Sequence, residues 1–144
     1  VENDLGDWYR ELFAPSVTVG LASPARLAGY RNSLVFIRQS QHVPMSVEAV
    51  RDAMPAFFDL LKSETDPVAR IVLGHFIFVY IHPFSDGNGR IARFLMNVMM
   101  AATGHPWTVI RIDHRNAYMA ALEAASVEEN IAPFTDLLKG ILEE

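Results

Sequence analysis

Cysteine is absent from this chain of 144 residues. Its absence excludes disulfide frameworks, thiolate zinc sites and cysteine nucleophiles, and it agrees with a reducing compartment. Lysine is also scarce, because only two of the twelve basic residues are lysines and the other ten are arginines. Arginine is suited to bidentate contacts with carboxylates and phosphates, although surface solubility alone also explains such usage.

Long hydrophobic runs and targeting signals are lacking too. The densest apolar stretch, residues 72–81, is interrupted by His75 and is too short to cross a bilayer. The chain has no signal peptide and starts with Val1 rather than Met, so we expect a fragment of a longer protein. We expect no membrane partner and a cytoplasmic location, with a secreted effector as the alternative.

Positive charge is not in excess either. The formal net charge of −5 argues against a nucleic-acid partner, because surfaces that bind nucleic acid are usually basic. Hydrophobic residues make up 51% of the chain and charged residues 20%, which is enough for a core and excludes general disorder. With one domain's length and no repeat or linker, the chain is predicted to form a single domain over 1–144.

Apolar residues recur at spacings of three and four along most of the chain, which predicts helices. Ser46, then Thr65 or Asp66, and later Asp113 are predicted N-caps. Prolines are expected to interrupt two helices, with a loop through Pro15 and a bend at Pro55. The predicted helices span residues 4–13, 24–30, 47–61, 68–81, 90–103, 114–125 and 133–141.

Two stretches lack this helical pattern. Residues 33–45 place apolar residues on both sides of a polar centre, which predicts two extended runs joined by a turn. Residues 107–112 are also predicted to be extended. The stretch 68–81 is apolar almost all round, so we expect an enclosed central helix. The predicted fold class is all-α, with at most one small β-hairpin.

The chemistry concentrates in residues 82–93, which read His-Pro-Phe-Ser-Asp-Gly-Asn-Gly-Arg-Ile-Ala-Arg. Gly87 and Gly89 leave the backbone free to turn its amides inward where the next helix begins, which forms an anion nest. Arg90 and Arg93 lie three residues apart on one face of that helix and are both predicted to point towards the anion. The pattern predicts a phosphate site.

The residues flanking the nest add chemistry. Asp86 is placed to hold a divalent cation between phosphate oxygens, since magnesium usually needs only one or two carboxylates. His82 is a candidate general base near neutral pH. Each feature also has an ordinary structural explanation, such as a helix cap, a turn or a solvated face. A Rossmann loop, a Walker loop and an EF-hand do not fit, because their required glycine, lysine and glutamate are missing.

Residues 82–93 resemble the signature of the Fic family, His-Pro-Phe-x-Asp/Glu-Gly-Asn-Gly-Arg-x-x-Arg, at every fixed position. The likeness extends more weakly from about Tyr30 to Leu138. It implies an all-α fold, with ATP as co-substrate and Mg²⁺ as cofactor. The implied reaction transfers AMP from ATP to a Ser, Thr or Tyr hydroxyl of a target protein, with pyrophosphate as the leaving group.

The resemblance also implies a role for each motif residue. His82 would deprotonate the target hydroxyl, Phe84 would anchor the loop in the core, and Asp86 would bind Mg²⁺. The other implied positions bind the nucleotide, as an anion hole (Gly87, Asn88 and Gly89) and as contacts to the β- and γ-phosphates (Arg90 and Arg93).

Outside the motif, the family has a β-hairpin flap that holds the target's backbone over the active site. The extended-turn-extended prediction for residues 33–45 coincides with it, and the candidate docking residues are Phe36, Ile37 and Arg38. A helix-connecting loop is the alternative for this stretch. Tyr118 is a candidate for the nucleobase pocket, with a buried core tyrosine as its alternative.

Many Fic proteins carry an inhibitory helix of the pattern Ser/Thr-x-x-x-Glu-Gly/Asn, and no serine or threonine here has glutamate four residues on. The inhibitory segment would then lie outside this chain, on a separate antitoxin, or be lacking. Other readings keep the fold but transfer UMP, phosphocholine or, as in the Doc branch, phosphate. A silent protein-binding module and a metal hydrolase built on His75, His82 and Asp86 are more distant alternatives.

Overall fold

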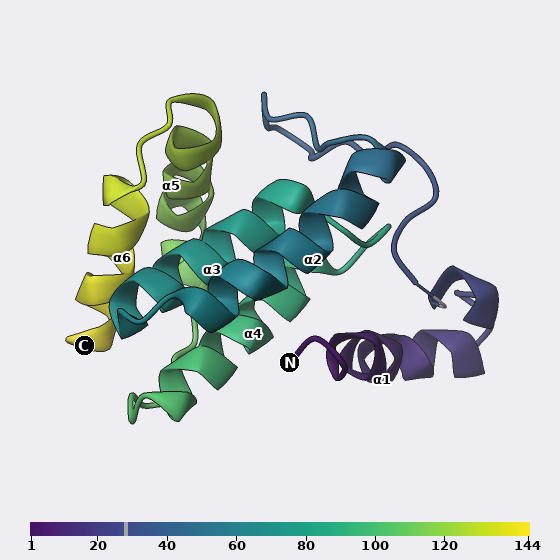
Figure 1. Ribbon diagram of the computed structural model, residues 1–144, viewed down its shortest axis with the longest axis horizontal. Coiled ribbons are helices and arrows are strands. Elements are labelled where there is room, and N and C mark those ends of the chain that lie inside the picture. The colour runs from purple at the N-terminus through teal and green to yellow at the C-terminus, as the bar shows by residue number, and fades with distance from the viewer. Residues whose placement is uncertain (28) are drawn as a thin grey trace.

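The computed structural model describes residues 1–27 and 29–144, and this part of the chain is all-α, as predicted. It contains no strand. Figure 1 shows the helices, whose bounds are α1 Leu5–Thr18, α2 Val47–Ser63, α3 Pro67–Ile81, α4 Asn88–Ala102, α5 Arg115–Val127 and α6 Ala132–Leu142, with short 3₁₀ turns η1 Pro24–Leu27 and η2 Ile112–His114.

Helix α3 is the centre of the fold and packs against α2, α4 and α5. In Figure 1, α2, α3 and α4 cross the middle of the molecule, with α5 and α6 at one end and α1 at the other. The predicted central position is confirmed, but the helix is enclosed only in part, because Val68, Leu73 and Tyr80 of α3 are exposed. Gly74 lets α4 approach closely, since a Cβ there would lie 2.8 Å from Cε of Met99.

The predicted starts of the two central helices are confirmed. The Ser46 hydroxyl accepts a hydrogen bond from the Ala49 amide at 3.2 Å. Asp66 Oδ1 accepts from the amides of Val68 and Ala69, at 2.8 and 2.9 Å. Both side chains thereby satisfy amides that a helix start leaves unpaired.

Neither proline ends its helix, so the loop predicted through Pro15 was wrong, while the bend at Pro55 stays a prediction. α1 continues through Pro15 to Thr18, and α2 continues through Pro55 to Ser63. A proline inside a helix removes one backbone hydrogen bond, and burial of the apolar face on its neighbours offsets that loss. In α2 this face includes Met54 and Phe57, which flank the proline.

Residues 33–45, which we call the flap, contain no strands, so the hairpin is not formed as a β-ladder. The flap makes a turn in which the Ser40 amide donates to the Ile37 carbonyl at 3.2 Å, and Gln39 is left-handed with φ of 62°. Polar groups that a ladder would pair are bound elsewhere, because Glu123 of α5 accepts from the Gln41 amide at 2.6 Å.

Three other boundaries differ from prediction. The helix predicted over 24–30 is only the 3₁₀ turn η1, and the last part of that prediction includes residue 28, which lies outside the described residues. α4 begins at Asn88 rather than Arg90. Asp113 does not cap α5, because it lies within η2 and pairs with Arg111 at 3.1 Å.

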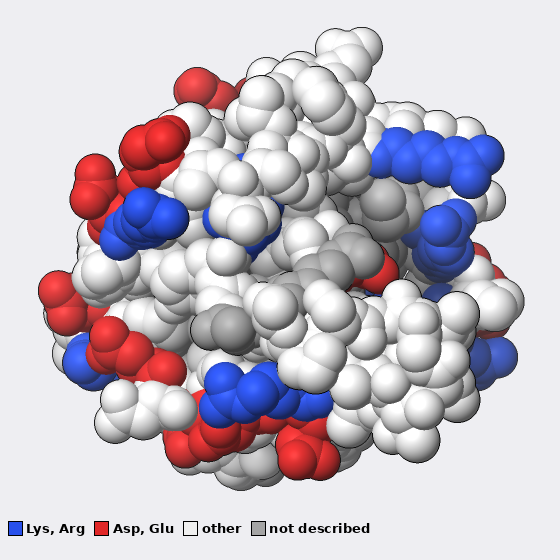
Figure 2. Space-filling view, turned by 90° about the vertical axis from the view of Figure 1, so that its right-hand side faces the viewer, with Lys and Arg blue, Asp and Glu red and all other residues white. Residues whose placement is uncertain are grey.

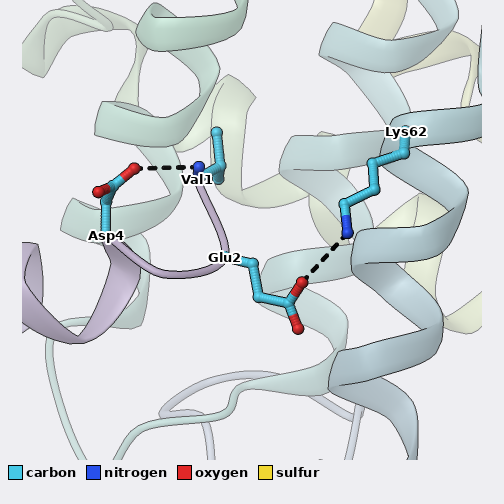
Figure 3. A network of polar contacts seen from close by, with 4 residues as sticks. All are labelled: Val1, Glu2, Asp4 and Lys62. Atoms are coloured by element: carbon cyan, nitrogen blue, oxygen red, sulfur yellow. Dashed lines mark hydrogen bonds and ion pairs between the residues drawn. The ribbon is translucent and has the colours of Figure 1, made fainter.

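The N-terminal segment reaches α2 through an exposed ion pair between Glu2 and Lys62, at 3.2 Å, while the Val1 amino group contacts Asp4 at 3.0 Å (Figure 3). Such exposed pairs contribute at most about 1 kcal/mol. On the face shown in Figure 2 uncharged side chains predominate, acidic side chains lie mostly along the left and lower edges, and basic side chains lie among them and on the right. No helix of the described residues has the length and apolar character needed to span a bilayer.

Candidate active site

His82 is the C-cap of α3 and adopts the left-handed conformation, with φ of 55° and ψ of 59°. Its amide donates to the Phe78 carbonyl at 3.0 Å, and its ring Nδ1 lies 3.2 Å from the Val79 carbonyl oxygen. Because a carbonyl only accepts, the proton of the neutral ring belongs on Nδ1. The lone pair of Nε2 is then available to accept a proton.

Burial lowers the pKa of His82 below its ordinary value of 6.5. The hydrogen bond to Val79 and the charge of Asp86 act in the opposite direction, while Arg31 and His42 lower the pKa further. A ring whose pKa is lowered is neutral at pH 7, which is the form that a general base requires.

The loop after His82 is anchored by Phe84 and Asn88. Phe84 is buried and its ring stacks on that of Tyr9 in α1, with centroids 3.8 Å apart. Oδ1 of Asn88 accepts from the Phe84 amide at 2.8 Å, and Nδ2 donates to the Phe84 carbonyl at 2.8 Å. The Asn88 side chain therefore shapes the loop, and only its backbone amide is left for an anion.

Glycine is favoured at positions 87 and 89 of the motif for different physical reasons. Gly87 has φ of 77°, and a Cβ there would lie 2.7 Å from the ring of Phe13 in α1. Glycine is thus required at position 87 by the backbone conformation and by the packing of α1. At Gly89 a Cβ would meet only the guanidinium of Arg93, at 3.3 Å, on the wall of a cavity.

A cavity of about 420 Å³ lies between the flap, the end of α3, the start of α4 and α5. Its volume falls within the range of small-molecule sites. The cavity collects several of the predicted site residues from distant parts of the sequence. Those in its wall are Ile37, Arg38, His82, Gly89, Arg93 and Tyr118.

Five of the predicted site residues are not in the wall of this cavity, namely Phe36, Asp86, Gly87, Asn88 and Arg90. Arg93 lines it, with its guanidinium 6.0 Å from the ring centroid of Tyr118, but the Arg90 guanidinium lies 5.0 Å from the centroid of Phe13, on the α1 side. Asp86 is exposed, accepts from the Gly87 amide at 2.7 Å, and lines a smaller cavity beside α1 and η1. Both arginines line a second cavity between α1 and α4, and only Arg93 also lines the cavity that contains His82.

Few of the described side chains could act as ligands of a metal ion at this site. Among the described residues, no three His, Asp or Glu side chains come together in a way that could hold a metal ion. His75 is fully buried with Nε2 bonded to the Tyr118 hydroxyl at 2.8 Å, so it is not a partner for His82 and Asp86. The single carboxylate of Asp86 still fits Mg²⁺, which takes most of its other ligands from phosphates and water.

Tyr118 and the predicted docking residues of the flap differ in their exposure and in whether they line the cavity. Tyr118 is only 5% exposed, and its hydroxyl is bound within the core, so it is a core residue that also contributes to the cavity wall. Phe36 is 78% exposed and is not part of the wall, whereas Ile37 and Arg38 are.

Sequence reasoning missed three residues around this cavity. Glu123 of α5 accepts from the Ser40 hydroxyl at 2.5 Å and lines the cavity, and these hydrogen bonds lower its pKa. His42 also lines it and contacts the Tyr80 carbonyl through Nε2 at 2.9 Å. Arg31 lies buried behind His82. No local pattern marks them, because their partners are tens of residues away.

Comparisons with known proteins agree with the motif. A sequence model of the Fic/DOC family matches residues 2–100. The chain is 40% identical over 120 residues to the protein adenylyltransferase Fic of Nematostella vectensis, covering 81% of this chain and 27% of that protein. It is 32% identical over 120 residues to the protein adenylyltransferase fic-1 of Caenorhabditis elegans, covering 81% of this chain and 23% of that protein. The chain thus spans about a quarter of these relatives.

Solved structures show the same fold. A fragment of Fic-1 from C. elegans superposes with a TM-score of 0.82 at 27% identity, covering 99% of this chain and 41% of that one. A Fic family protein from Desulfovibrio desulfuricans G20 gives a TM-score of 0.81 at 27% identity, covering 99% of this chain and 44% of that one.

Proposed function

We propose that this chain, which belongs to the Fic/DOC family, transfers AMP from ATP to a Ser, Thr or Tyr hydroxyl of a target protein and releases pyrophosphate. The observation that carries the proposal is the shared cavity of His82, Gly89 and Arg93. It brings a neutral imidazole, the first turn of a helix and a guanidinium to one space of suitable size. Relatives named protein adenylyltransferase support the same reaction.

His82 acts as the general base in this proposal. Its Nε2 takes the proton of the target hydroxyl as the oxygen attacks the α-phosphorus and the bond to the pyrophosphate oxygen breaks. The contact of Nδ1 with the Val79 carbonyl holds the ring in the tautomer that this step needs. A positioned base of this kind accelerates proton transfer by about 10²–10⁴-fold.

The start of α4 binds the phosphates. Amides in the first turn of a helix have no partner within the helix and attract anions, and here these include the amides of Asn88 and Gly89. The Gly87 amide is already bound to Asp86 and supports the turn instead. Arg93 adds a guanidinium from the cavity wall, and Arg90, which lines a neighbouring cavity together with Arg93, is the second candidate.

Asp86 is the residue that would hold Mg²⁺, which when bound would neutralise phosphate charge and orient the phosphate oxygens. The target protein would bind along the flap, whose backbone is not paired in a β-ladder and is therefore open to strand addition. Ile37 and Arg38 would line the path to the cavity, and the exposed ring of Phe36 would contact the target.

No serine or threonine in this chain is followed by glutamate four residues later. An inhibitory glutamate of the family pattern would then lie in another segment or on an antitoxin chain, or the enzyme has none. The second motif glycine and Arg93 favour AMP transfer over the phosphate transfer of the Doc branch. UMP and phosphocholine transfer are the alternatives, and their test replaces ATP with labelled UTP or CDP-choline in the assay below.

The test is a labelling assay with Mg²⁺ and ATP carrying label on the α- or the γ-phosphate, run against a lysate and against the protein alone. We expect protein-bound α-label that falls by at least about 10²-fold in His82→Ala, with ATP affinity retained. His105→Ala, at an exposed histidine beyond α4, is the matched control and should transfer normally. Protein-bound γ-label, or α-label that persists in His82→Ala, would contradict the proposal.

A further inference from the structure

Arg31 lies at the base of the flap and is only 4% exposed. All the partners found for its guanidinium are backbone carbonyl oxygens. Nε donates to His82 at 2.7 Å and Nη1 to Ser33 at 3.1 Å. Nη2 donates to Met45 at 2.5 Å and to Ile81 at 3.4 Å.

We propose that Arg31 is a positioning residue that fixes the flap relative to the catalytic histidine through one buried guanidinium. Two of its acceptors, Ser33 and Met45, are the first and last residues of the flap, and the other two are the end of α3 and its cap. A backbone contact strengthens the link, because the Arg31 amide donates to the Pro83 carbonyl at 2.8 Å. The catalytic consequence rests on the proposed function, whereas the structural link does not.

The need for such a residue follows from how α3 ends. The last carbonyls of a helix have no partner within the helix, and their partial negative charge favours a cation. His82 is held in a left-handed conformation that residues other than glycine rarely adopt, so surrounding contacts must hold it there. Arg31 provides one of these contacts directly at the His82 carbonyl.

The flap needs the same residue for a different reason. Its two ends are not joined by a β-ladder, so nothing in the regular secondary structure holds them together. The guanidinium bonds to both ends at once and places them beside the cap of α3. Target binding by the flap and proton transfer by His82 would then both depend on Arg31.

Lysine could not replace arginine in this role. A guanidinium carries five N–H donors in a fixed plane, while an ammonium is a compact point charge with three donors. Arg31→Lys keeps the charge beside the end of α3 but loses the planar span between the flap and His82. Comparing Arg31→Lys, which keeps the charge, with Arg31→Met, which removes it, separates the effect of the bridging hydrogen bonds from the effect of the charge.

The experiment compares Arg31→Met and Arg31→Lys with Arg51→Met, at an exposed arginine on α2. Amide hydrogen exchange would be measured over residues 31–45 and 81–87, with kcat and KM for ATP measured alongside. We expect faster exchange in both segments, and a kcat about 10²-fold lower with KM for ATP unchanged, because a small misplacement of the base has a cost of this order. Arg31→Lys should share both effects, and Arg51→Met neither.

Unchanged exchange in either segment of Arg31→Met, or full recovery in Arg31→Lys, would overturn the proposal. If Arg31→Met does not fold, Arg31→Lys decides by the same two measurements. If the wild-type chain transfers no AMP, the proposed function fails, but exchange in the two segments still decides whether Arg31 links them.

Discussion

At the scale of single residues, α3 carries two histidines whose environments differ. His75 is fully buried, with Nε2 bonded to the Tyr118 hydroxyl at 2.8 Å and its ring stacked on Phe134. His82, seven residues later, lies at a cavity with one nitrogen free to accept a proton. The two are the same residue type, one within α3 and one at its cap, and burial and partners separate the structural histidine from the proposed base.

Burial lowers the pKa of His75 to about 4, and this shift predicts how stability changes with pH. The unfolded chain binds a proton to this histidine below its ordinary pKa of 6.5, whereas the folded chain does so only below about 4. His75 therefore stabilises the fold above pH 6.5, and this contribution is lost as the pH falls towards 4. The full loss is about 3 kcal/mol of unfolding free energy.

Urea unfolding at a series of pH values measures this dependence. The double variant His75→Leu with Tyr118→Phe removes both polar partners, so its unfolding free energy should fall less steeply between pH 6.5 and 4 than that of the wild type. Equal slopes in the two proteins would show that His75 is protonated as easily in the folded state as in the unfolded one.

At the scale of elements, the flap is held by contacts with two helices, α5 and α3. Glu123 of α5 accepts from the Ser40 hydroxyl at 2.5 Å and the Gln41 amide at 2.6 Å, which fixes the turn over the cavity. The ring of His42 packs in a tilted arrangement against that of Tyr80 of α3, with centroids 4.2 Å apart. The turn is therefore attached to α3 and α5 rather than to an opposing strand.

Removal of the Glu123 carboxylate should loosen the turn without unfolding the domain. We expect Glu123→Ala to speed amide exchange over residues 38–42 while α3 and α4 stay protected, because only flap contacts are lost. Glu128→Ala, at an exposed glutamate that follows α5, is the control. Slow amide exchange over residues 38–42 in Glu123→Ala would contradict this prediction and would mean that the contacts of His42 are enough to hold the turn.

Glu123→Ala should also lower the affinity for the target more than the affinity for ATP, since the flap is the proposed docking segment.

The pKa of Glu123 is lowered most by its hydrogen bond with Ser40 and next by its hydrogen bond with Gln41. A carboxylate with a lowered pKa keeps its charge in mild acid, so the turn should stay attached until the pH falls below the ordinary value of 4.5.

At the scale of the whole molecule, the elements with local signals were predicted well. Ser46 and Asp66 bind the amides that a cap should bind, and the pattern of apolar residues identified the central helices. The motif loop was located because its residues are adjacent in sequence. The predictions failed where contacts between distant segments decide the outcome, as at Pro15, where α1 continues, and at the flap, which forms no β-ladder.

Helix α1 tests whether residues 1–144 form one domain, as the length and composition predict. Figure 1 places α1 at the opposite end of the molecule from α5 and α6. Its link to the rest is aromatic, because Tyr9 is 1% exposed and stacks on Phe84 of the motif loop, and Phe13 lies against Gly87. Folding of α1 and ordering of the motif loop should therefore be coupled.

Tyr9→Ala should lower the unfolding free energy by about 3–5 kcal/mol, as expected for truncation of a buried aromatic ring. In a single domain this loss is shared, so urea unfolding should stay a single transition, and exchange should accelerate in α1 and α6 alike. Trp107→Ala, at a ring that is 57% exposed, is the control and should change stability far less. If exchange instead accelerated in α1 and the motif loop while α6 stayed protected, α1 would be a separately folding unit. The motif loop, which contacts α1 through Phe84 and Gly87, would then change its order with that unit.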